Sequence, residues 1–418
     1  MRIVVIGAGV VGITTAWYLA KDGHEVSVLE ARDGVALETS FGNAGGVCPG
    51  FAGPWAAPGM PFKALKWMFS PAAPLKIRPA FSLAQWTWLM RFVMNCTAER
   101  YTVNKTRMQK VAHYSKAQLK LLREETGIQY DHGTGGVLQL FQTKDEVEGG
   151  RRNAQVLSSL GIPHRLLSAA EACEVEVGLA GSQVPIMGGL QLIDDETGDC
   201  HLFCRELEKL CRGVGVSFSF GARVTGLQTD GGRVSTIEVT HGQGGEGEAT
   251  KREIEADAIV LATGPQMELL HALGLNVPVY PVKGYSMTTE IKNEAAAPRS
   301  SVMDEHSKVM ITRLGNRIRA AGVAELAGFN SSMPEAVLRG INERVKALFP
   351  DAADYDDVQW WHGFRPMTAD GPSQVSRSRY ENLYLNIGHG SSGWTQACGT
   401  GKMMADLIAD RPFDVALS

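Results

Sequence analysis

Three glycines in G-x-G-x-x-G spacing, beginning at Gly7, constrain the fold of this chain more than any other feature. They follow a short β-branched run over residues 2–6 and open an apolar stretch over residues 10–21. A second apolar run, residues 25–29, ends on Glu30. A strand, a glycine turn, a helix and a second strand ending on a carboxylate form the unit that binds dinucleotides.

Each part of this motif has a physical task. Gly7 permits a tight turn, Gly9 lets the backbone approach a pyrophosphate, and Gly12 lets the helix pack against the strands. The free N–H groups at the helix start favour phosphate, and Glu30 can accept hydrogen bonds from ribose hydroxyls but repels a 2′-phosphate. We therefore expect dinucleotide contacts at Gly7, Ala8, Gly9, Val10, Val11, Gly12, Glu30, Ala31 and Arg32.

Composition excludes several other classes. The chain has 418 residues, enough for two domains, and a formal charge of −4 without a long basic block, so a nucleic-acid partner is not expected. Its seven cysteines lack the paired spacing of a metal site, so no metal is expected. Residues 3–20 carry no charged side chain and are long enough for a membrane-spanning helix. The glycine motif within them instead favours a buried strand followed by a helix.

Two internal segments favour FAD over NAD. The loop over residues 38–46 is polar and glycine-rich, although an ordinary surface loop could have this composition. Residues 256–264 are typical of a buried strand ending in a glycine turn, and a hairpin begins near residue 223 and continues to a loop tip over 243–247. From these segments we expect contacts at Ser40, Asn43, Ala44, Gly45, Gly46, Val224, Thr263 and Gly264.

The carboxyl-terminal segment supplies the third feature. A predicted strand over 383–387 leads into a glycine turn and a helix over 395–410, whose start suits the flavin's pyrimidine carbonyl. No second nucleotide unit follows, so nicotinamide is not the expected electron partner, and no attachment motif indicates a covalent flavin. The predicted contacts here are Gly388, His389, Gly390, Ser391, Gly393, Trp394 and Thr395.

These features together resemble the D-amino acid oxidase-like flavoprotein superfamily, and within it the bacterial D-amino acid dehydrogenases of the small-subunit type. The resemblance runs over nearly the whole chain. It rests on residues 52–59, 65–69, 189–192, 195–200, 280–286, 363–368 and 388–401. It implies an FAD-dependent oxidoreductase that deaminates free D-amino acids to 2-oxo acids and ammonia, with hydride transfer from Cα to flavin N5.

The resemblance also implies an α/β (α+β composite) architecture, in which a Rossmann-like FAD-binding domain is interleaved with a mixed-sheet substrate domain. The predicted FAD-binding domain is discontinuous, and the substrate domain fills the two insertions. Such a layout puts the substrate pocket between the domains. The FAD-binding domain comprises 1–50, 185–265 and 360–418, and the substrate domain comprises 51–184 and 266–359.

Four side chains are candidates for the chemistry. Arg365, after the apolar run 360–364, can grip a substrate carboxylate with two hydrogen bonds, although a salt bridge within the protein is the alternative. Arg313 is a second cation, and Tyr285 could offer its hydroxyl to the carboxylate or be a core tyrosine. His389 is expected to contact the flavin or cap the local helix rather than to act as a base.

These motifs do not identify the electron acceptor. The resemblance implies that it is a quinone or an artificial dye. Residues 62–95 interleave basic and aromatic side chains, a pattern that fits a membrane-surface helix, a lid or packing within the substrate domain. A cytoplasmic protein is expected, with peripheral contact on the cytoplasmic face of the inner membrane as one interpretation.

Three alternatives remain open. A related flavin enzyme acting on glycine, sarcosine or hydroxyproline shares every motif and differs only in pocket shape. A non-catalytic FAD-binding electron-transfer subunit would not need Arg365 and Tyr285. An NAD-dependent dehydrogenase would not be yellow after purification.

Overall fold

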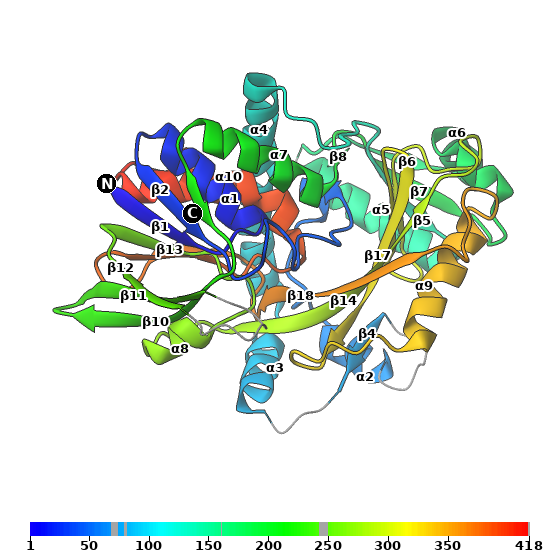
Figure 1. Ribbon diagram of the computed structural model, residues 1–418. Helices are drawn as coiled ribbons and strands as arrows, with labels where there is room; N and C mark the ends of the chain where they lie inside the picture. Colours follow the sequence, from blue (N-terminus) through cyan, green and yellow to red (C-terminus); the bar gives the residue numbers. More distant parts are fainter. Residues whose placement is uncertain (68–73, 79–81, 160, 242–249, 417–418) are drawn as a thin grey trace.

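Two large sheets, a three-stranded sheet and a two-stranded pair organise the described part of the chain (Figure 1). The computed structural model describes residues 1–67, 74–78, 82–159, 161–241 and 250–416. The loop tip expected over 243–247 lies outside the described residues. The fold is the predicted mixture of parallel and mixed sheets covered by helices, and the α/β prediction is confirmed.

The six-stranded sheet carries the amino-terminal motif. Its strand order is β19-β20-β13-β1-β2-β9, and all neighbouring pairs are parallel except β19 with β20. The two ends of the chain meet here, because β1 and β20 both pair with β13. The strands are β1 (Arg2–Ile6), β2 (Glu25–Leu29), β9 (Ser217–Ser219), β13 (Ala258–Leu261), β19 (Gln374–Arg377) and β20 (Leu383–Ile387).

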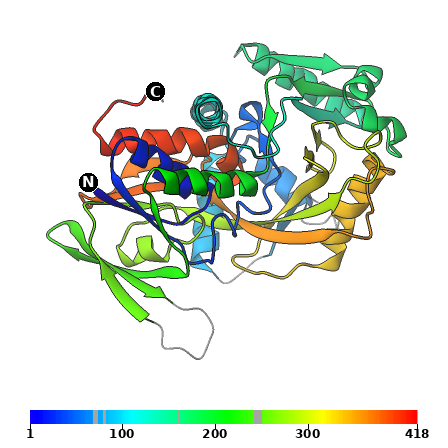
Figure 2. The ribbon, with the colours of Figure 1, turned by 45° about the horizontal axis from the view of Figure 1, so that its top comes forward.

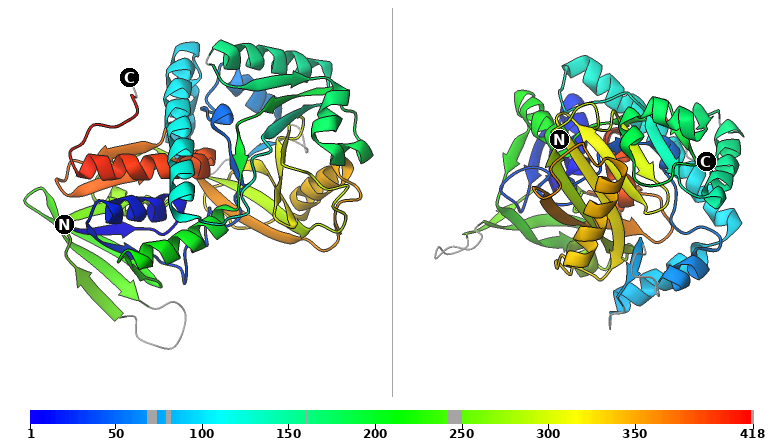
Figure 3. Two further views of the ribbon diagram at one scale, coloured as in Figure 1. Left: turned by 90° about the horizontal axis from the view of Figure 1, so that it is seen from above. Right: turned by 90° about the vertical axis from the view of Figure 1, so that its right-hand side faces the viewer.

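Helices α1 (Val10–Lys21), α7 (Cys200–Gly213) and α10 (Gly393–Ile408) pack beside this sheet, with α1 in contact with both of the others. The long helix α4 (Ala98–Thr126) packs on α10 and stands between the two parts of the molecule (Figure 3). Its ends have clear local causes. The Thr97 hydroxyl accepts a hydrogen bond from the Arg100 N–H, and Gly127 ends the helix at a φ of 67°.

A three-stranded antiparallel sheet projects beside the six-stranded one (Figure 2). It contains β10 (Ala222–Asp230), β11 (Arg233–His241) and β12 (Thr250–Ile254), so the hairpin expected near residue 223 is present. The short helix α8 (Glu268–Ala272) lies against β10.

The largest sheet is mixed, in the order β18-β14-β17-β16-β15-β5-β7-β6, with β4 paired to β17. Strands β14 and β18 run side by side from the six-stranded part into this sheet (Figure 1). The strands are β4 (Leu75–Ile77), β5 (Val137–Phe141), β6 (His164–Leu167), β7 (Gly188–Leu192), β14 (Val279–Glu290), β15 (Ser301–Asp304), β16 (Val309–Leu314), β17 (Arg317–Leu326) and β18 (Gln359–Thr368).

Helix α9 packs on β14 and β17, and α5 and α6 pack near β6 and β7. A two-stranded pair, β3 with β8, joins the loop after the nucleotide motif to the segment before α7. The remaining elements are α5 (Lys144–Ser159), α6 (Ala169–Val175), α9 (Glu335–Leu348), β3 (Gly46–Val47), β8 (Glu196–Thr197), η1 (Pro49–Phe51), η2 (Val177–Gly181) and η3 (Gly390–Ser392).

Strand pairing bears on the expected division of the chain. The segments 185–265 and 360–418 were expected to belong to the FAD-binding part, yet β7 and β18 within them pair with strands of the largest sheet. The boundaries of a two-part division therefore fit better after β7 and after β18, and the division itself stays a prediction.

Residues 62–95 form two helices and a short strand, with 68–73 and 79–81 outside the described part of the chain. Helices α2 (Met60–Trp67) and α3 (Leu83–Asn95) flank β4. One face of α3 packs inward through Trp88, whose indole N–H donates to the Met367 carbonyl at 2.8 Å. Among the described residues, no helix combines the length and apolar character needed to cross a bilayer.

Candidate active site

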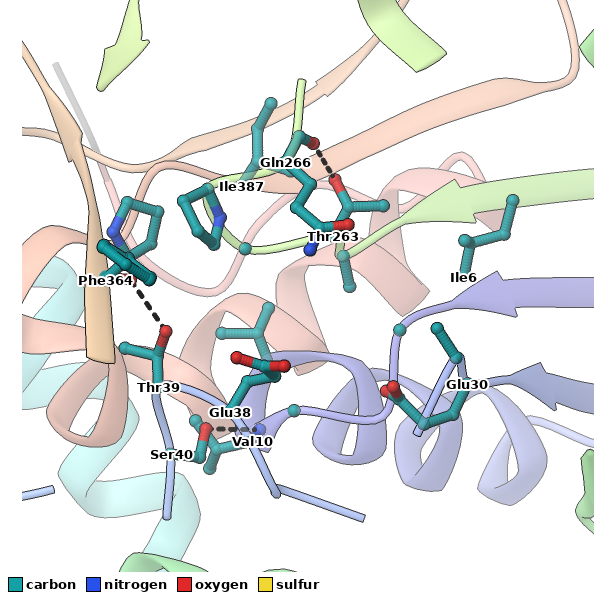
Figure 4. A pocket seen from close by; sticks show the side chains of 18 of the residues that line it. Ile6, Val10, Glu30, Glu38, Thr39, Ser40, Thr263, Gln266, Phe364 and Ile387 are labelled. Carbon is teal, nitrogen blue, oxygen red and sulfur yellow. Dashed lines mark hydrogen bonds between the residues drawn. The ribbon is translucent and has the colours of Figure 1, made fainter. Parts of the chain in front are cut away.

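A cavity of about 830 Å³ opens at the carboxyl ends of β1, β2, β13 and β20, the edge where parallel sheets of this kind bind ligands (Figure 4). Glu30 lies at one end of the cavity and Phe364 at the other. Most of the predicted cofactor contacts line it, namely Gly7, Gly9, Val10, Val11, Glu30, Ala31, Arg32, Ser40, Asn43, Val224, Thr263, Gly264, Gly388, His389, Gly390, Gly393 and Trp394.

The three motif glycines differ in what surrounds them. Gly7 has a φ of 105°, and a Cβ there would lie 2.6 Å from the Ala262 carbonyl oxygen. A Cβ on Gly12 would lie 1.8 Å from the Gly7 carbonyl oxygen, so this glycine allows the turn to pack on the helix. At Gly9 the nearest atom is Ser40 Oγ at 3.6 Å, so the absent side chain leaves space in the cavity. Gly12 itself does not line the cavity.

Glu30 holds the turn while facing the cavity. Its Oε2 accepts a hydrogen bond from the Ala8 N–H at 2.7 Å, and its Oε1 accepts one from the Arg32 N–H at 2.9 Å. Burial raises the pKa of the Glu30 carboxyl, and these backbone donors act against that rise. Each oxygen has a further lone pair that can accept from a hydroxyl in the cavity. Ala8 is buried behind the carboxylate and contributes only its backbone.

The loop after the motif divides into two halves. Ser40 Oγ accepts a hydrogen bond from the Val10 N–H at 3.1 Å, at the start of α1, and Asn43 lines the cavity while its Oδ1 accepts from the Gly45 N–H at 2.8 Å. The predicted contacts Ala44, Gly45 and Gly46 do not line the cavity. A Cβ on Gly46 would lie 2.5 Å from Met310 Cε, so this half packs against the largest sheet.

The turn after β20 closes the cavity from the carboxyl-terminal side. Gly388 and Gly390 have φ of 77° and 58°, the region that favours glycine. Ser391 is exposed and Thr395 is buried, and neither lines the cavity. Thr395 Oγ1 instead accepts from the Cys48 N–H at 3.1 Å, which ties this turn to the loop after the motif.

Two buried polar atoms of cavity-lining residues have no partner within the described part of the chain. They are Trp394 Nε1, a donor, and Asn386 Oδ1, an acceptor. Both side chains reach into the helix layer, because Asn386 Nδ2 donates to Thr15 Oγ1 at 3.0 Å and the Trp394 ring packs on Phe203. The start of α1 and Glu30 fit a ligand that carries phosphates and ribose hydroxyls.

His389 is buried, and its Nε2 lies 2.9 Å from Thr400 Oγ1. Burial lowers the pKa of His389 to about 3, so the ring is neutral at physiological pH. A neutral ring held by a hydroxyl can position a ligand but does not supply a cation. A pKa this low makes the ring a weak base, and its contact with the cofactor stays a prediction.

Arg365 lies on β18 between Phe364 and Pro366, which both line the cavity, whereas Arg365 itself does not. Its Nη1 donates to the carbonyl oxygens of Lys283 and Val323, each at 3.3 Å. Burial alone lowers the pKa of Arg365 to about 10. No carboxylate of the described residues pairs with this guanidinium, so the salt bridge considered as an alternative is not formed there.

The other two chemical candidates have protein partners. Arg313 pairs with Glu294 at 2.7 Å and donates to the Gly315 carbonyl, so it is a structural cation. Tyr285 is 1% exposed, packs in the core under α9, and donates its hydroxyl to Glu325. Neither residue lines the cavity.

Sequence reasoning missed an aromatic wall. Phe329 and Phe364 both line the cavity, with ring centroids 5.3 Å apart in an edge-to-face arrangement. Phe364 could have been found, because it precedes Arg365 on the same strand. Phe329 lies in a loop without a motif and had no such signal. Thr39 was also missed, and its hydroxyl donates to the Phe364 carbonyl at 2.7 Å (Figure 4).

The chain is similar to relatives over nearly the whole length of both sequences. The protein named D-amino acid dehydrogenase from Granulibacter bethesdensis is 47% identical over 412 residues, which cover 98% of this chain and 96% of the relative. The protein of the same name from Agrobacterium fabrum is 46% identical over 410 residues, covering 98% and 96% of the two chains.

Solved structures share the fold at low identity. Glycine oxidase from Geobacillus kaustophilus superposes with a TM-score of 0.74 at 21% identity, covering 100% of this chain and 97% of the other. L-proline dehydrogenase from P. horikoshii superposes with a TM-score of 0.74 at 18% identity, covering 100% and 95%. A model of the family described as FAD dependent oxidoreductase matches residues 2–407. The chain is therefore a member of the FAD dependent oxidoreductase family.

Proposed function

We propose that this protein oxidatively deaminates free D-amino acids to 2-oxo acids and ammonia, with FAD as its cofactor. The observation that carries the substrate class is the guanidinium of Arg365, which lies on β18 between two cavity-lining residues and has no carboxylate partner among the described residues. Such a group favours a bound anion, and a planar carboxylate matches its geometry. The relatives named D-amino acid dehydrogenase, matched along nearly the whole chain, support the choice of substrate.

FAD, when bound, supplies the acceptor for the hydride that leaves the substrate Cα. Glu30 and the start of α1 would hold its ribose and phosphates, and the turn at Gly388 would lie at its ring end. Arg365 would fix the substrate carboxylate, and Phe329 and Phe364 would form an aromatic wall of the cofactor cavity. His389 is neutral and bonded to Thr400, so it is not the proposed base for the substrate amine.

The experiment that tests this function is anaerobic flavin reduction. Purified FAD-loaded protein is mixed with D- and L-amino acids, glycine, sarcosine and hydroxyproline, and flavin absorbance is followed at roughly 450 nm. Bleaching by D-amino acids and not by their L-enantiomers is expected. Bleaching by glycine or sarcosine alone would assign the protein to a different amine substrate, and a yellow protein that no amine bleaches would overturn the proposal.

A quinone is the proposed electron acceptor. The support is the resemblance to the bacterial D-amino acid dehydrogenases, which implies a quinone or an artificial dye as the acceptor. Substrate-reduced protein should be reoxidised faster by a soluble ubiquinone analogue than by dissolved oxygen, measured by stopped-flow recovery of the flavin absorbance. Faster recovery with oxygen would make the protein an oxidase.

Peripheral contact with the cytoplasmic face of the inner membrane is proposed through helices α2 and α3. One stripe of α3 is apolar and exposed, with Leu83 84%, Trp86 55% and Met90 59% accessible. The adjoining helix α2 exposes Phe62 together with Lys63. Apolar side chains beside basic ones suit the boundary of an anionic bilayer.

This contact is tested by sedimentation with phosphatidylglycerol-containing vesicles. Wild-type protein should sediment with them and release partly at high salt, whereas the double variant Leu83→Glu/Trp86→Glu should stay in solution. The matched control is Leu121→Glu, which changes a 56% exposed leucine on α4. Equal sedimentation of all three proteins would contradict contact through α3.

A further inference from the structure

The guanidinium of Arg365 lies directly on the backbone of β14 at Gly284. A Cβ built on Gly284 would fall 2.2 Å from Arg365 Nη1 and 2.4 Å from Cζ. Both distances are far below van der Waals contact, so any side chain at position 284 displaces the guanidinium. The displaced atoms are the far end of a flexible side chain, so the strand can accept the substitution without a backbone shift.

The carbonyl oxygens that hold Arg365 come from an irregularity between β14 and β17. Lys283 pairs with Glu325, but Tyr285 pairs with Gly322, so two residues of β17 stand opposite Gly284. This is a β-bulge, and it turns the Val323 carbonyl toward Nη1. Val323 has a φ of 56°, a strained conformation for a β-branched residue, and such outliers gather at functional sites.

A buried ionic cluster brackets the bulge. Lys283 and Glu325, which are 0% and 1% exposed, form an ion pair with Nζ and Oε2 3.0 Å apart. Tyr285 donates its hydroxyl to the same carboxylate, and Lys283 Nζ also donates to the Ser332 carbonyl at 2.9 Å. Buried charges must remain paired, so this cluster fixes the two strands relative to each other on both sides of Gly284.

The side chains of the cluster and of Arg365 point to opposite faces of the sheet. Lys283 and Tyr285 flank Gly284 on β14, and Arg365 stands opposite Val282 on β18. Successive residues of a strand alternate between faces, and directly paired residues share one. The cluster can therefore set the position of the two carbonyl groups without contacting a ligand beside the guanidinium.

We propose that Gly284, the bulge at Val323 and the Lys283–Glu325–Tyr285 cluster are positioning residues for the carboxylate-binding Arg365. Nη1 is anchored to two carbonyl oxygens, and no other hydrogen bond or ion pair joins the guanidinium to the described residues. The remaining N–H groups are thus held in place for a carboxylate. The Arg365 side chain loses its conformational freedom when the protein folds, so that entropy cost does not weaken the binding of the carboxylate. This inference rests on the proposed function, because it takes Arg365 as the carboxylate ligand.

The test uses FAD-loaded protein and the variant Gly284→Ala. The affinity for benzoate, a carboxylate without an amine, is measured by calorimetry, with uncharged benzamide as the reference ligand. We expect the Kd for benzoate and the substrate concentration that half-saturates anaerobic bleaching to rise by about ten-fold or more. FAD content and Tm should not change. The matched control is Gly340→Ala on α9, where a Cβ meets no atom within 4 Å.

A double-mutant cycle separates positioning from general damage. In the Arg365→Leu background, Gly284→Ala should no longer change the benzoate affinity, because the group it displaces is absent. Three outcomes would each overturn the proposal. Gly284→Ala could have an effect of the same size in both backgrounds, or a benzoate Kd within about two-fold of wild type. The third outcome is that wild type does not bind benzoate. If the cycle behaves as expected and no D-amino acid bleaches the flavin, the positioning role stands and the proposed function fails.

Discussion

The carboxylate of Glu30 accepts a hydrogen bond from the backbone N–H of Ala8 at 2.7 Å, so the tip of β2 holds the turn that leaves β1. The same carboxylate reaches the cavity edge (Figure 4). Glu30 therefore fixes the turn and faces the cavity, and we predict that it also accepts hydrogen bonds from the cofactor ribose. Both contacts depend on its remaining an acceptor.

Glu30→Gln should weaken FAD binding by about ten-fold or more, because the amide turns one N–H donor toward groups that need an acceptor. The measurement is the FAD Kd of the apoprotein by flavin fluorescence. Glu38→Gln is the matched control, since Glu38 lines the same cavity but is half exposed and pairs with Arg32. An equal loss of FAD affinity in both variants would contradict a specific contact between Glu30 and the cofactor.

Alanine at Gly9 and at Gly12 should have different consequences. Gly12→Ala drives a Cβ against the Gly7 carbonyl oxygen, so it should lower the Tm of the apoprotein. Gly9→Ala meets only Ser40 Oγ at 3.6 Å, so the apoprotein should keep its Tm while FAD affinity falls. Differential scanning fluorimetry with and without FAD distinguishes the two. A Gly9→Ala protein that binds FAD like wild type would place the pyrophosphate elsewhere.

Arg365→Leu should lower kcat/KM for D-amino acids, with a loss of transition-state stabilisation of about 3–5 kcal/mol. This is the range for removing one partner of a desolvated charge pair. Arg313→Leu provides the comparison, because that arginine pairs with the exposed Glu294 away from the cavity. Its effect should stay below about 1 kcal/mol. Steady-state kinetics with an artificial acceptor measure both. A small effect for Arg365→Leu would require another carboxylate ligand.

His389 should make the protein sensitive to acid. Its pKa is lowered to about 3 in the folded protein, so the unfolded chain binds this proton at higher pH. The associated stability is fully present above the ordinary histidine pKa and is lost as pH falls toward 3, with a slope of up to about 1.4 kcal/mol per pH unit. The free energy of unfolding, measured by urea titration at several pH values between those limits, should change less steeply with pH in His389→Asn than in wild type. Parallel curves would contradict the assignment.

Asp195 should act with the opposite sign. Burial raises the pKa of its carboxyl to about 7, and its Oδ2 has no partner in the described part of the chain. The folded protein therefore holds this proton to higher pH than the unfolded chain does, and stability declines as pH rises from the ordinary aspartate pKa to about 7. Asp195→Asn should stabilise the protein more at pH above 7 than below 5, as urea titrations at each pH would show. A gain that is equal at both would argue against titration of Asp195.

Local patterns predicted the nucleotide-binding elements closely. The strand 2–6, the helix 10–21 and the strand 25–29 have the bounds of β1, α1 and β2, and 383–387 has those of β20. These elements combine a buried apolar run with an adjacent glycine or turn residue, a pattern that is local in sequence. Their side chains face the cavity because the motif determines both the turn and the helix start.

Partners distant in sequence could not be predicted. Tyr285 meets Glu325 and Arg313 meets Glu294 only because strands of the largest sheet bring them together. Phe329 reaches the cavity from a loop, and no periodic pattern marks it. The sequence also offered no sign that β7 and β18 pair within the largest sheet, since their partner strands are distant in sequence or carry no motif that identifies the pairing.

The meeting of both chain ends at β13 has a consequence for synthesis. One wall of the cavity is translated within the first 43 residues, but the turn from Gly388 to Trp394 emerges almost last. A ribosome that stops before that turn releases a chain without the turn and without α10, the helix that packs beside the sheet. Retention of the yellow cofactor should therefore report that translation has passed this turn.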